Sequence, residues 1–266
     1  MAPKWRKLAD RLADRIRSGD PMYAPGRQLP HIRELVEAGE GSKSTVHAAY
    51  KALEAEGLVT SSRGHGTVVR QQAALKRLGI GRYDKAKWRD GDEVAFVADR
   101  VASGRTYRRG EQTQSVTLGE APPEALAAYG LPTGTELYAR ARLVKEGEQP
   151  THTLTSYYRP EHVDGTPLVD PTPGPAGRGG GFRVLLDAGY EIDQMKEELL
   201  ARAPTREEAK LLRLPVGEPV VELRRTTRTA DGTVVEFAVG VHAASRFAWE
   251  YSFRIPDSAR DGRDVQ

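Results

Sequence analysis

The chain has 266 residues, no cysteine and a formal net charge of +3. Without cysteine, disulfides, thiolate zinc sites, iron–sulfur clusters and cysteine nucleophiles are excluded. No apolar run approaches the roughly 20 residues that span a bilayer, and charges interrupt the N-terminal stretch, so we expect neither a membrane segment nor a signal peptide. With 38% hydrophobic residues, this length predicts two ordinary soluble domains in the cytoplasm.

Positive charge is concentrated in the first part of the chain. Residues 1–70 hold 12 Lys and Arg against 8 Asp and Glu, whereas residues 71–266 hold 28 against 29. A small domain with a positive excess is compatible with a polyanionic partner, because cations near phosphates release condensed counterions. A solvated surface without a partner would give the same composition, so charge alone does not decide the function.

Helical periodicity predicts two helices near the N-terminus. Apolar residues recur at three- and four-residue spacing between charged positions over residues 4–18, which predicts an amphipathic helix. The sequence YAPGRQLP at 23–30 is typical of a turn. The apolar residues from Ile32 to Val36 then predict a short second helix that ends before Gly39.

A third helix and a hairpin follow. Ser42 or Ser44 can cap a helix by accepting from the free amides of its first turn, and this helix continues until Gly57. From Leu58 the period changes to two, and the runs LVTSS and TVVR predict short strands joined by RGHG at a hairpin tip. Three helices and a hairpin form a winged helix-turn-helix, whose third helix enters the DNA major groove while the hairpin lies against the backbone.

The exposed side of the third helix and the hairpin carry the side chains that such an interface needs. Lysine can donate to guanine acceptors or phosphate, hydroxyls can donate to either, and histidine can reach a base edge. Glycines at the hairpin tip let a backbone approach a sugar-phosphate chain closely. The predicted DNA-binding residues are Arg33, Ser42, Lys43, Ser44, Thr45, His47, Arg63, Gly64, His65, Gly66 and Thr67.

Three stretches together resemble the DNA-binding domain of the GntR family of bacterial transcription regulators, over about residues 4–69. They are PGRQLP with REL at 25–35, SKSTVHAAYKALEAEGLV at 42–59 and RGHGTVV at 63–69. The resemblance implies DNA binding and places Arg33 where the family contacts DNA. Lys43 and His47 stand where the family usually has arginine, so the resemblance implies no operator sequence. A protein-binding module of the same shape is the alternative.

The next segment, residues 71–112, is basic and interrupted by glycines, which is typical of a linker. Within it, EVAFVADRVASG at 93–104 fits either a strand or a short helix. Lys76, Arg77 and Arg82 could add phosphate contacts, but a solvated linker is the favoured interpretation.

Beyond the linker the chain repeats itself. Residues 121–148 and 203–232 share a helix that begins at proline, a Leu-Pro-x-Gly turn and an arginine-rich strand, which predicts a pseudo-symmetric α+β domain. Most connections are short, so the sheet should be mainly antiparallel, whereas the Pro- and Gly-rich residues 160–181 predict a mobile flap. The predicted strands are 113–118, 136–146, 149–159, 190–202, 219–230, 233–243 and 247–255.

This second half, with VVEFAVGVHAASRF at its end, resembles the UTRA ligand-sensing domain of HutC-type GntR regulators over about residues 113–255. The resemblance implies a chorismate-lyase-like fold and an effector pocket lined by Arg140, Arg142 and Glu236, with Tyr157 and Arg246 in neighbouring segments. Strand alternation independently puts both of the first two arginines on one face, where they could bind a carboxylate or phosphate. On an exposed face they would pair with surface glutamates instead.

Phosphosugar-binding members of this family carry a serine- and threonine-rich loop before the first repeat. This chain has WRDGDEVAFVADRVASGRTYR there. A phosphosugar effector is therefore not expected.

We predict an α+β protein in four segments. A winged helix-turn-helix (1–70) is joined through residues 71–112 to a mainly antiparallel effector-binding and dimerisation domain of chorismate-lyase-like (UTRA) fold (113–256), followed by a disordered tail (257–266). The predicted function is a homodimeric repressor at the bacterial nucleoid. It binds a palindromic double-stranded DNA operator and is released by a small-molecule effector, an anion if the paired arginines face the pocket.

Two other classes of protein are weighed against this regulator. An enzyme is not expected, because no catalytic motif is present, and the six histidines lack metal-ligand spacing, so neither a metal nor another cofactor is expected. The alternative function is a DNA-binding plasmid-maintenance or architectural protein without an effector. Thermal shifts would distinguish it, because DNA alone would stabilise an architectural protein.

Overall fold

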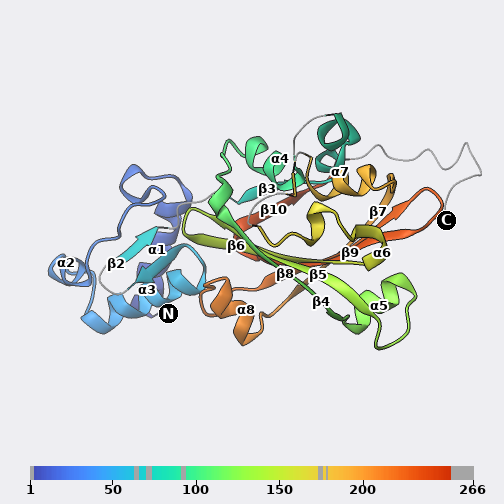
Figure 1. Ribbon diagram of the computed structural model, residues 1–266. Helices are drawn as coiled ribbons and strands as arrows, with labels where there is room; N and C mark the ends of the chain where they lie inside the picture. The colour runs from blue at the N-terminus through green and yellow to red at the C-terminus, as the bar shows by residue number, and fades with distance from the viewer. Residues whose placement is uncertain are drawn as a thin grey trace, which may run out of the picture.

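The computed structural model shows a small helical part at the N-terminus beside a larger part built on a sheet (Figure 1). Among the residues it describes, no helix is both long and apolar enough to cross a bilayer. The tail that we expected to be disordered, 257–266, lies outside these residues. The described residues are 3–62, 66–69, 74–90, 94–172, 176–177 and 179–252.

The N-terminal part has the three helices and the hairpin that the periodicity predicted. Its core is centred on Leu8, Leu12, Val46 and Leu53, each at most 3% exposed, so the apolar faces of α1 and α3 pack against one another. The two strands pair antiparallel. The elements are α1 Lys4–Arg17, η1 Pro21–Tyr23, α2 Ile32–Glu37, α3 Lys43–Ala55, β1 Val59–Ser62 and β2 Gly66–Val69.

Gly57 ends α3, as the sequence indicated. Its φ of 73° lies in the left-handed region, and the backbone NH of Leu58 donates back to the carbonyl of Leu53 at 3.0 Å. This turn directs the chain out of the helix into β1, where Val59 is fully buried.

The larger part contains a six-stranded antiparallel sheet in the order β4-β5-β6-β9-β8-β7. Six of the seven predicted strands therefore lie in this sheet, with ends shifted by two residues at most, and the mainly antiparallel arrangement is confirmed. Their bounds are β4 Gln112–Glu120, β5 Glu136–Glu146, β6 Gln149–Tyr158, β7 Ile192–Arg202, β8 Val220–Thr229 and β9 Val234–Ala243.

The internal repeat is confirmed by the order of the strands. Each copy runs outer strand, helix, middle strand, inner strand, and the two inner strands β6 and β9 meet at the centre of the sheet. The helices are α5 (Pro123–Tyr129) and α8 (Arg206–Leu211). Thr205 and Glu208 cap α8 reciprocally, since the NH of Glu208 donates to the Thr205 hydroxyl at 3.1 Å and the NH of Thr205 donates to the Glu208 carboxylate at 2.8 Å.

Different elements cover the two faces of this sheet (Figure 1). One face packs against α5 and the end of α8 through Leu126 and Leu212, which contact Phe237 and Val241 of β9. The opposite face carries Tyr158 and packs on α7. The elements on this second side are α4 Ala95–Ala102, α6 Pro160–Val163, η5 Pro167–Val169, α7 Gly180–Asp187 and the short strands β3 Leu75–Leu78 and β10 Phe247–Glu250.

Our expectation of a solvated linker is wrong for the described residues between 74 and 111. Here β3 pairs in parallel with β10, and Trp88 is only 3% exposed. The basic composition indicated a linker, but carboxylates of β7 and α4 neutralise Arg77 and Arg82, as described below. Besides β3 and α4, this stretch holds η2 Ile80–Tyr83, a π-helical turn η3 Ala86–Asp90 and η4 Arg109–Glu111.

Two further expectations need correction. The proposed flap at 160–181 contains α6, η5 and the start of α7 in its described part, with Val163 and Leu168 fully buried or nearly so, because these apolar side chains anchor it to the sheet. The last strand was predicted at 247–255. Among the described residues it ends at Glu250, since β3 offers four residues with which to pair, and residues 253–255 lie outside the described part of the chain.

Candidate functional site

The first turn of α3 presents polar side chains to solvent. The Ser42 hydroxyl accepts from the NH of Thr45 at 3.2 Å and lies 2.9 Å from the Ser44 hydroxyl, so Ser42 acts first as the helix cap. Lys43, Ser44 and His47 are exposed, while Val46 on the other side of the helix is fully buried. This is the arrangement that reading of base edges in a major groove requires.

Arg33 lies on the neighbouring helix α2. Its guanidinium forms an ion pair with Glu37 one turn later, at 2.7 Å, and both side chains are largely exposed. Such a surface pair contributes little to stability. Arg33 can therefore exchange this partner for a DNA phosphate at small cost.

Of the hairpin residues that we predicted to contact DNA, the structure describes Gly66 and Thr67. Thr67 on β2 places its hydroxyl 3.1 Å from that of Ser61 across the hairpin. Gly66 has a φ of 74°, a left-handed conformation that favours glycine, so the local backbone alone accounts for glycine at this position; a Cβ there would displace the flexible side-chain amide of Gln28. The tip residues Arg63, Gly64 and His65 lie outside the described residues.

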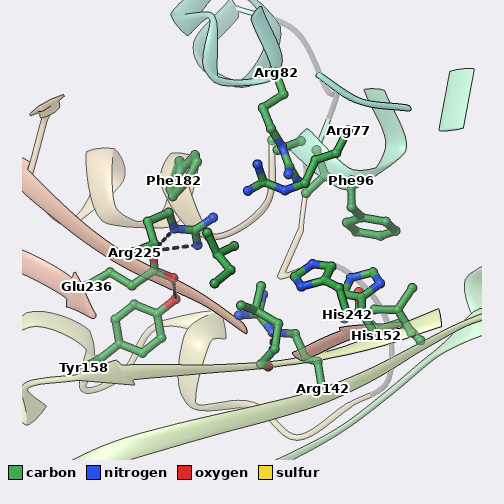
Figure 2. A pocket seen from close by; sticks show the side chains of 18 residues that line it. Arg77, Arg82, Phe96, Arg142, His152, Tyr158, Phe182, Arg225, Glu236 and His242 are labelled. Atoms are coloured by element: carbon green, nitrogen blue, oxygen red, sulfur yellow. Dashed lines mark hydrogen bonds and ion pairs between the residues drawn. The ribbon is translucent and has the colours of Figure 1, made fainter. Parts of the chain in front are cut away.

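A pocket of about 700 Å³, including the part open to solvent, lies between the sheet and the elements on its second side. Figure 2 shows the side chains that surround it, with arginines projecting from several directions. The sheet contributes Gln112, Arg142, Val144, His152, Leu154, Tyr158, Leu223, Arg225, Glu236 and His242, and the covering elements contribute Arg77, Arg82, Val94, Ala95, Phe96, Gly179, Gly181 and Phe182.

Arg142 of β5 is the cation that lines this pocket without a carboxylate partner among the described residues. It donates to the Ser156 hydroxyl and, at 3.4 Å, to the carbonyl of Leu154. Burial lowers the pKa of Arg142 to about 10, and the neighbouring charge of Arg140 acts in the same direction. Arg140 lies on the same face, is 2% exposed and donates to the Gln114 side chain at 2.7 Å, so pairing with surface glutamates is excluded for both arginines.

Glu236 of β9 is the acceptor at the centre of a buried network. One oxygen accepts from Ser156 at 2.7 Å and from Tyr158 at 2.9 Å, and the other accepts from Arg225 at 2.7 Å. Burial opposes ionisation of this carboxyl, but Arg225 and the Ser156 hydroxyl more than offset it, so the pKa of Glu236 lies below its ordinary value. Glu236 is thus charged and already satisfied by protein groups.

Three residues that we predicted for the effector site do not line this pocket. Arg140 lies beside it on the same face of β5 as Arg142, whereas Tyr157 and Arg246 lie elsewhere. Tyr157 points to the opposite face of the sheet, where its ring lies 6.3 Å from that of Phe237, because successive strand residues alternate between faces and it is Tyr158 that faces the pocket. Arg246 is buried, and it donates to the carbonyls of Leu212 at 3.0 Å and Pro150. Its guanidinium thereby holds backbone together at the end of α8, away from this pocket.

Two arginines that we expected in a solvated linker, with possible phosphate contacts, are buried above the pocket instead. Arg77 donates to Glu197 of β7 at 3.0 Å, and Arg82 forms an ion pair with Asp99 of α4 at 3.1 Å. Despite burial, the Arg77 guanidinium lowers the pKa of Glu197 to about 2. The alternation of buried and exposed residues along 75–78 could not be read from the sequence, because Leu-Lys-Arg-Leu does not alternate apolar and polar residues. By contrast, the internal repeat could have pointed to Arg225, which occupies the strand equivalent to that of Arg142.

Two histidines stack at one end of the pocket. The rings of His152 and His242 are nearly parallel, with centroids 4.8 Å apart. Burial, together with nearby arginines, lowers the pKa of His152 to about 3 and also lowers that of His242, so both rings are neutral. Within the described part of the chain, no three His, Cys, Asp or Glu side chains group in a way that could hold a metal ion.

Comparison with known proteins gives two matches to family descriptions. Residues 4–69 match "Bacterial regulatory proteins, gntR family", and residues 106–248 match "UTRA domain". Residues between these two ranges, including β3, η2 and α4, belong to neither match.

Similar proteins carry regulator names. The chain is 75% identical over 97% of its length to the uncharacterized HTH-type transcriptional regulator SCO4628 of Streptomyces coelicolor, of which it covers 95%. It is 25% identical to the HTH-type transcriptional repressor NagR of Bacillus subtilis, covering 93% of each chain. The crystal structure of PhnF from Mycobacterium smegmatis shows the same fold, with a TM-score of 0.53 at 18% identity, over 92% of this chain and 99% of that one.

Proposed function

Because this chain belongs to the GntR family of bacterial transcriptional regulators and carries a UTRA domain, we propose that it is a dimeric repressor that an anionic small molecule releases from its operator. The family consists of regulators and not of enzymes. We place its action in the cytoplasm, at the nucleoid.

The DNA-binding half of the proposal rests on the two helices α2 and α3. Arg33, Lys43 and His47 are exposed together with the hydroxyl of Ser44, whereas the apolar residues of the same helices form the core. Side chains that serve no packing role and can donate to phosphates or base edges are what a groove-reading helix offers. The B. subtilis relative is named a repressor, which supports repression here.

A dimer is supported by the outer strands of the sheet. Leu118 of β4 and Leu199 and Leu200 of β7 are between 41% and 55% exposed. Apolar edge strands are surfaces on which a second copy can pair, and two-fold symmetry matches the symmetry of a palindromic operator.

The observation that carries the effector proposal is the state of Arg142. A guanidinium that is largely withdrawn from water and lacks a carboxylate partner among the described residues is electrostatically unsatisfied, and an anion in the pocket would satisfy it. A ligand that prefers the arrangement unable to bind DNA would then shift the population and release the operator.

The test is a footprint of the purified full-length chain on fragments of its own genome at fixed salt. We expect protection of a palindromic site by the wild-type chain and by Arg142→Gln, with release by the effector only in the wild type. The variant should retain full DNA affinity but lose effector affinity about 10- to 100-fold, the usual effect of losing a charge-assisted hydrogen bond. A protein that has no effector, such as an architectural one, would show no difference between the two chains under any metabolite.

A further inference from the structure

The geometry points to Arg77 and Arg82 as ligand contacts that set specificity, and to a ligand that is a monocarboxylic acid with an apolar body. This inference rests on the proposed function, since it concerns the same pocket. It adds to the site a segment, formed by β3, η2 and α4, that lies outside both family matches. We call this segment the roof.

The roof arginines face Arg142 across the pocket. Figure 2 shows the guanidinium ends of Arg77 and Arg82 converging on one side of the cavity, with Arg142 on the opposite side. Arg77 is 1% exposed and Arg82 is 7% exposed, so both charges are held inside the protein and are not surface charges of a linker. A ligand in this pocket therefore lies between two sets of guanidinium groups.

Hydrogen bonds of the roof arginines are incomplete. The Nε atoms of both Arg77 and Arg82 are buried and have no hydrogen-bond partner among the described residues. Buried polar groups are almost always satisfied, so an exception of this kind calls for an acceptor from outside the chain. A small movement of the two side chains toward a bound ligand would supply the missing acceptors.

The number of unpaired charges limits the charge of the ligand. Glu197 compensates Arg77, Asp99 compensates Arg82, and Glu236 compensates Arg225. Arg142 is left to attract one negative group. A second full negative charge beneath the roof would lie close to Glu197 and Asp99 and would be repelled. The roof arginines can instead donate to neutral acceptors of the ligand, such as carbonyl or ether oxygens.

Beside Gln112, Tyr158 and the two stacked histidines, the remaining lining is apolar and partly aromatic. Phe96 comes from α4, Phe182 from α7, and Leu154 and Leu223 from the sheet. A sugar would leave its hydroxyls without partners against these side chains, whereas an aromatic or branched hydrocarbon body would bury apolar surface. One carboxylate on Arg142 and an apolar body under the roof satisfy both the charge and the lining.

The test measures binding of defined probes to the full-length chain by thermal shift and calorimetry. Benzoate and indole-3-acetate represent aromatic monocarboxylates, indole-3-acetamide is the uncharged match, and inorganic phosphate and glucose 6-phosphate represent dianions. We expect the carboxylates to bind, and the amide at least about tenfold more weakly. Tighter binding of either phosphate, or no binding of either carboxylate at millimolar concentration, would overturn the ligand class.

A paired variant tests the roof itself. Arg82→Gln alone leaves Asp99 buried without its cation, so we combine it with Asp99→Asn, which keeps an acceptor for the NH of Leu78 now 2.9 Å away. We expect the double variant to bind indole-3-acetate about tenfold more weakly, while Lys76→Gln, an exposed neighbour on β3, leaves binding unchanged. Wild-type affinity in the double variant would remove the roof from the site.

The same proteins separate this inference from the proposed function. A DNA footprint without ligand should be the same for the wild type and the double variant. If the wild type binds DNA but prefers phosphates, only the ligand class fails. If the wild type shows no footprint on any genomic fragment, the proposed function itself fails.

Discussion

The face of α2 and α3 and the pocket over the sheet use the same residue types in opposite ways. Arg33 is exposed and its partner Glu37 lies one helical turn away, whereas Arg225 is 5% exposed and its partner Glu236 comes from the neighbouring strand. An exposed ion pair is screened by solvent and can exchange partners. A buried ion pair is fixed, because breaking it leaves an unpaired charge buried in the protein. The first surface is therefore suited to a partner that arrives and leaves, and the second to a defined ligand.

Removing one member of a buried pair should have the largest effect. Glu236→Gln leaves the buried Arg225 without its carboxylate partner, and we expect it to lower the free energy of unfolding by about 3–5 kcal/mol. Urea unfolding of the full-length chain measures this loss. Glu37→Gln is the control on the exposed face, and an equal loss in that control would contradict the comparison.

The second-largest effect should be a loss of unfolding free energy in acid, caused by the histidines at the pocket. The pKa of His152 is lowered to about 3 and that of His242 is also lowered, so the unfolded chain binds more protons than the folded one below the ordinary histidine pKa of about 6.5. Stability contributed by the neutral rings is present above that pH and is lost as pH falls toward 3, at up to about 1.4 kcal/mol per pH unit for each ring.

Unfolding free energies of the wild type and His152→Gln, measured from pH 7 to pH 5, provide the check. The variant should show the shallower pH dependence. Ser44→Ala on the exposed face removes no titratable group and should keep the wild-type slope, and a change of slope there would count against the assignment of the acid sensitivity to the stacked pair.

Variants on the DNA face should alter recognition without altering stability. Lys43→Ala and His47→Ala should each reduce the preference for the specific site over other DNA, by about tenfold, because they remove contacts to base edges. Arg33→Ala should weaken binding to all sequences and reduce the salt slope by about one, as expected of a phosphate contact. Fluorescence anisotropy against specific and random duplexes at several salt concentrations distinguishes the two patterns.

Lys51→Ala is the matched control on the last turns of α3, where its side chain is exposed and lies 3.8 Å from Glu54. Loss of specificity in this control, or none in the other two variants, would mean that the first turn of α3 does not read the groove.

The smallest effect sharpens the assignment of one strand. Tyr158→Phe removes a 2.9 Å hydrogen bond to Glu236 and should cost about 1 kcal/mol of stability and weaken effector binding. Tyr157→Phe, one residue earlier, should change neither, because its ring packs on the other face. A ligand effect of Tyr157→Phe alone would reverse our correction.

The same comparison explains what the sequence could and could not predict. Helices and strands follow local periodicity, so α1, α3 and β5 lie close to their expected bounds. Alternation along β5 also correctly predicts that Arg140 and Arg142 lie on the same face of the strand. The choice between Tyr157 and Tyr158 failed because a single residue decides the face of a strand.

The roof could not be predicted by such local patterns. Arg77 has its partner Glu197 in β7, which is 120 residues away in the chain, and only the folded topology brings the two together. A buried charge and a solvated one look identical in composition until the partner is known. For this reason, we interpreted as a linker a segment that in fact forms one wall of the pocket.

The parallel pairing of β3 with β10 also limits where the DNA-binding part can go. β2 ends at Val69 and β3 begins at Leu75. The six peptide steps between them span at most about 20 Å even when fully extended, so this connection limits the distance between each DNA-binding part and the sheet. In the dimer proposed above, two such connections must let the DNA-binding parts reach half-sites that repeat every helical turn, about 34–36 Å. The dimer would then select operators by the spacing of their half-sites. Inserting half a turn of DNA between the half-sites would turn one of them to the far side of the duplex, beyond the reach of its DNA-binding part.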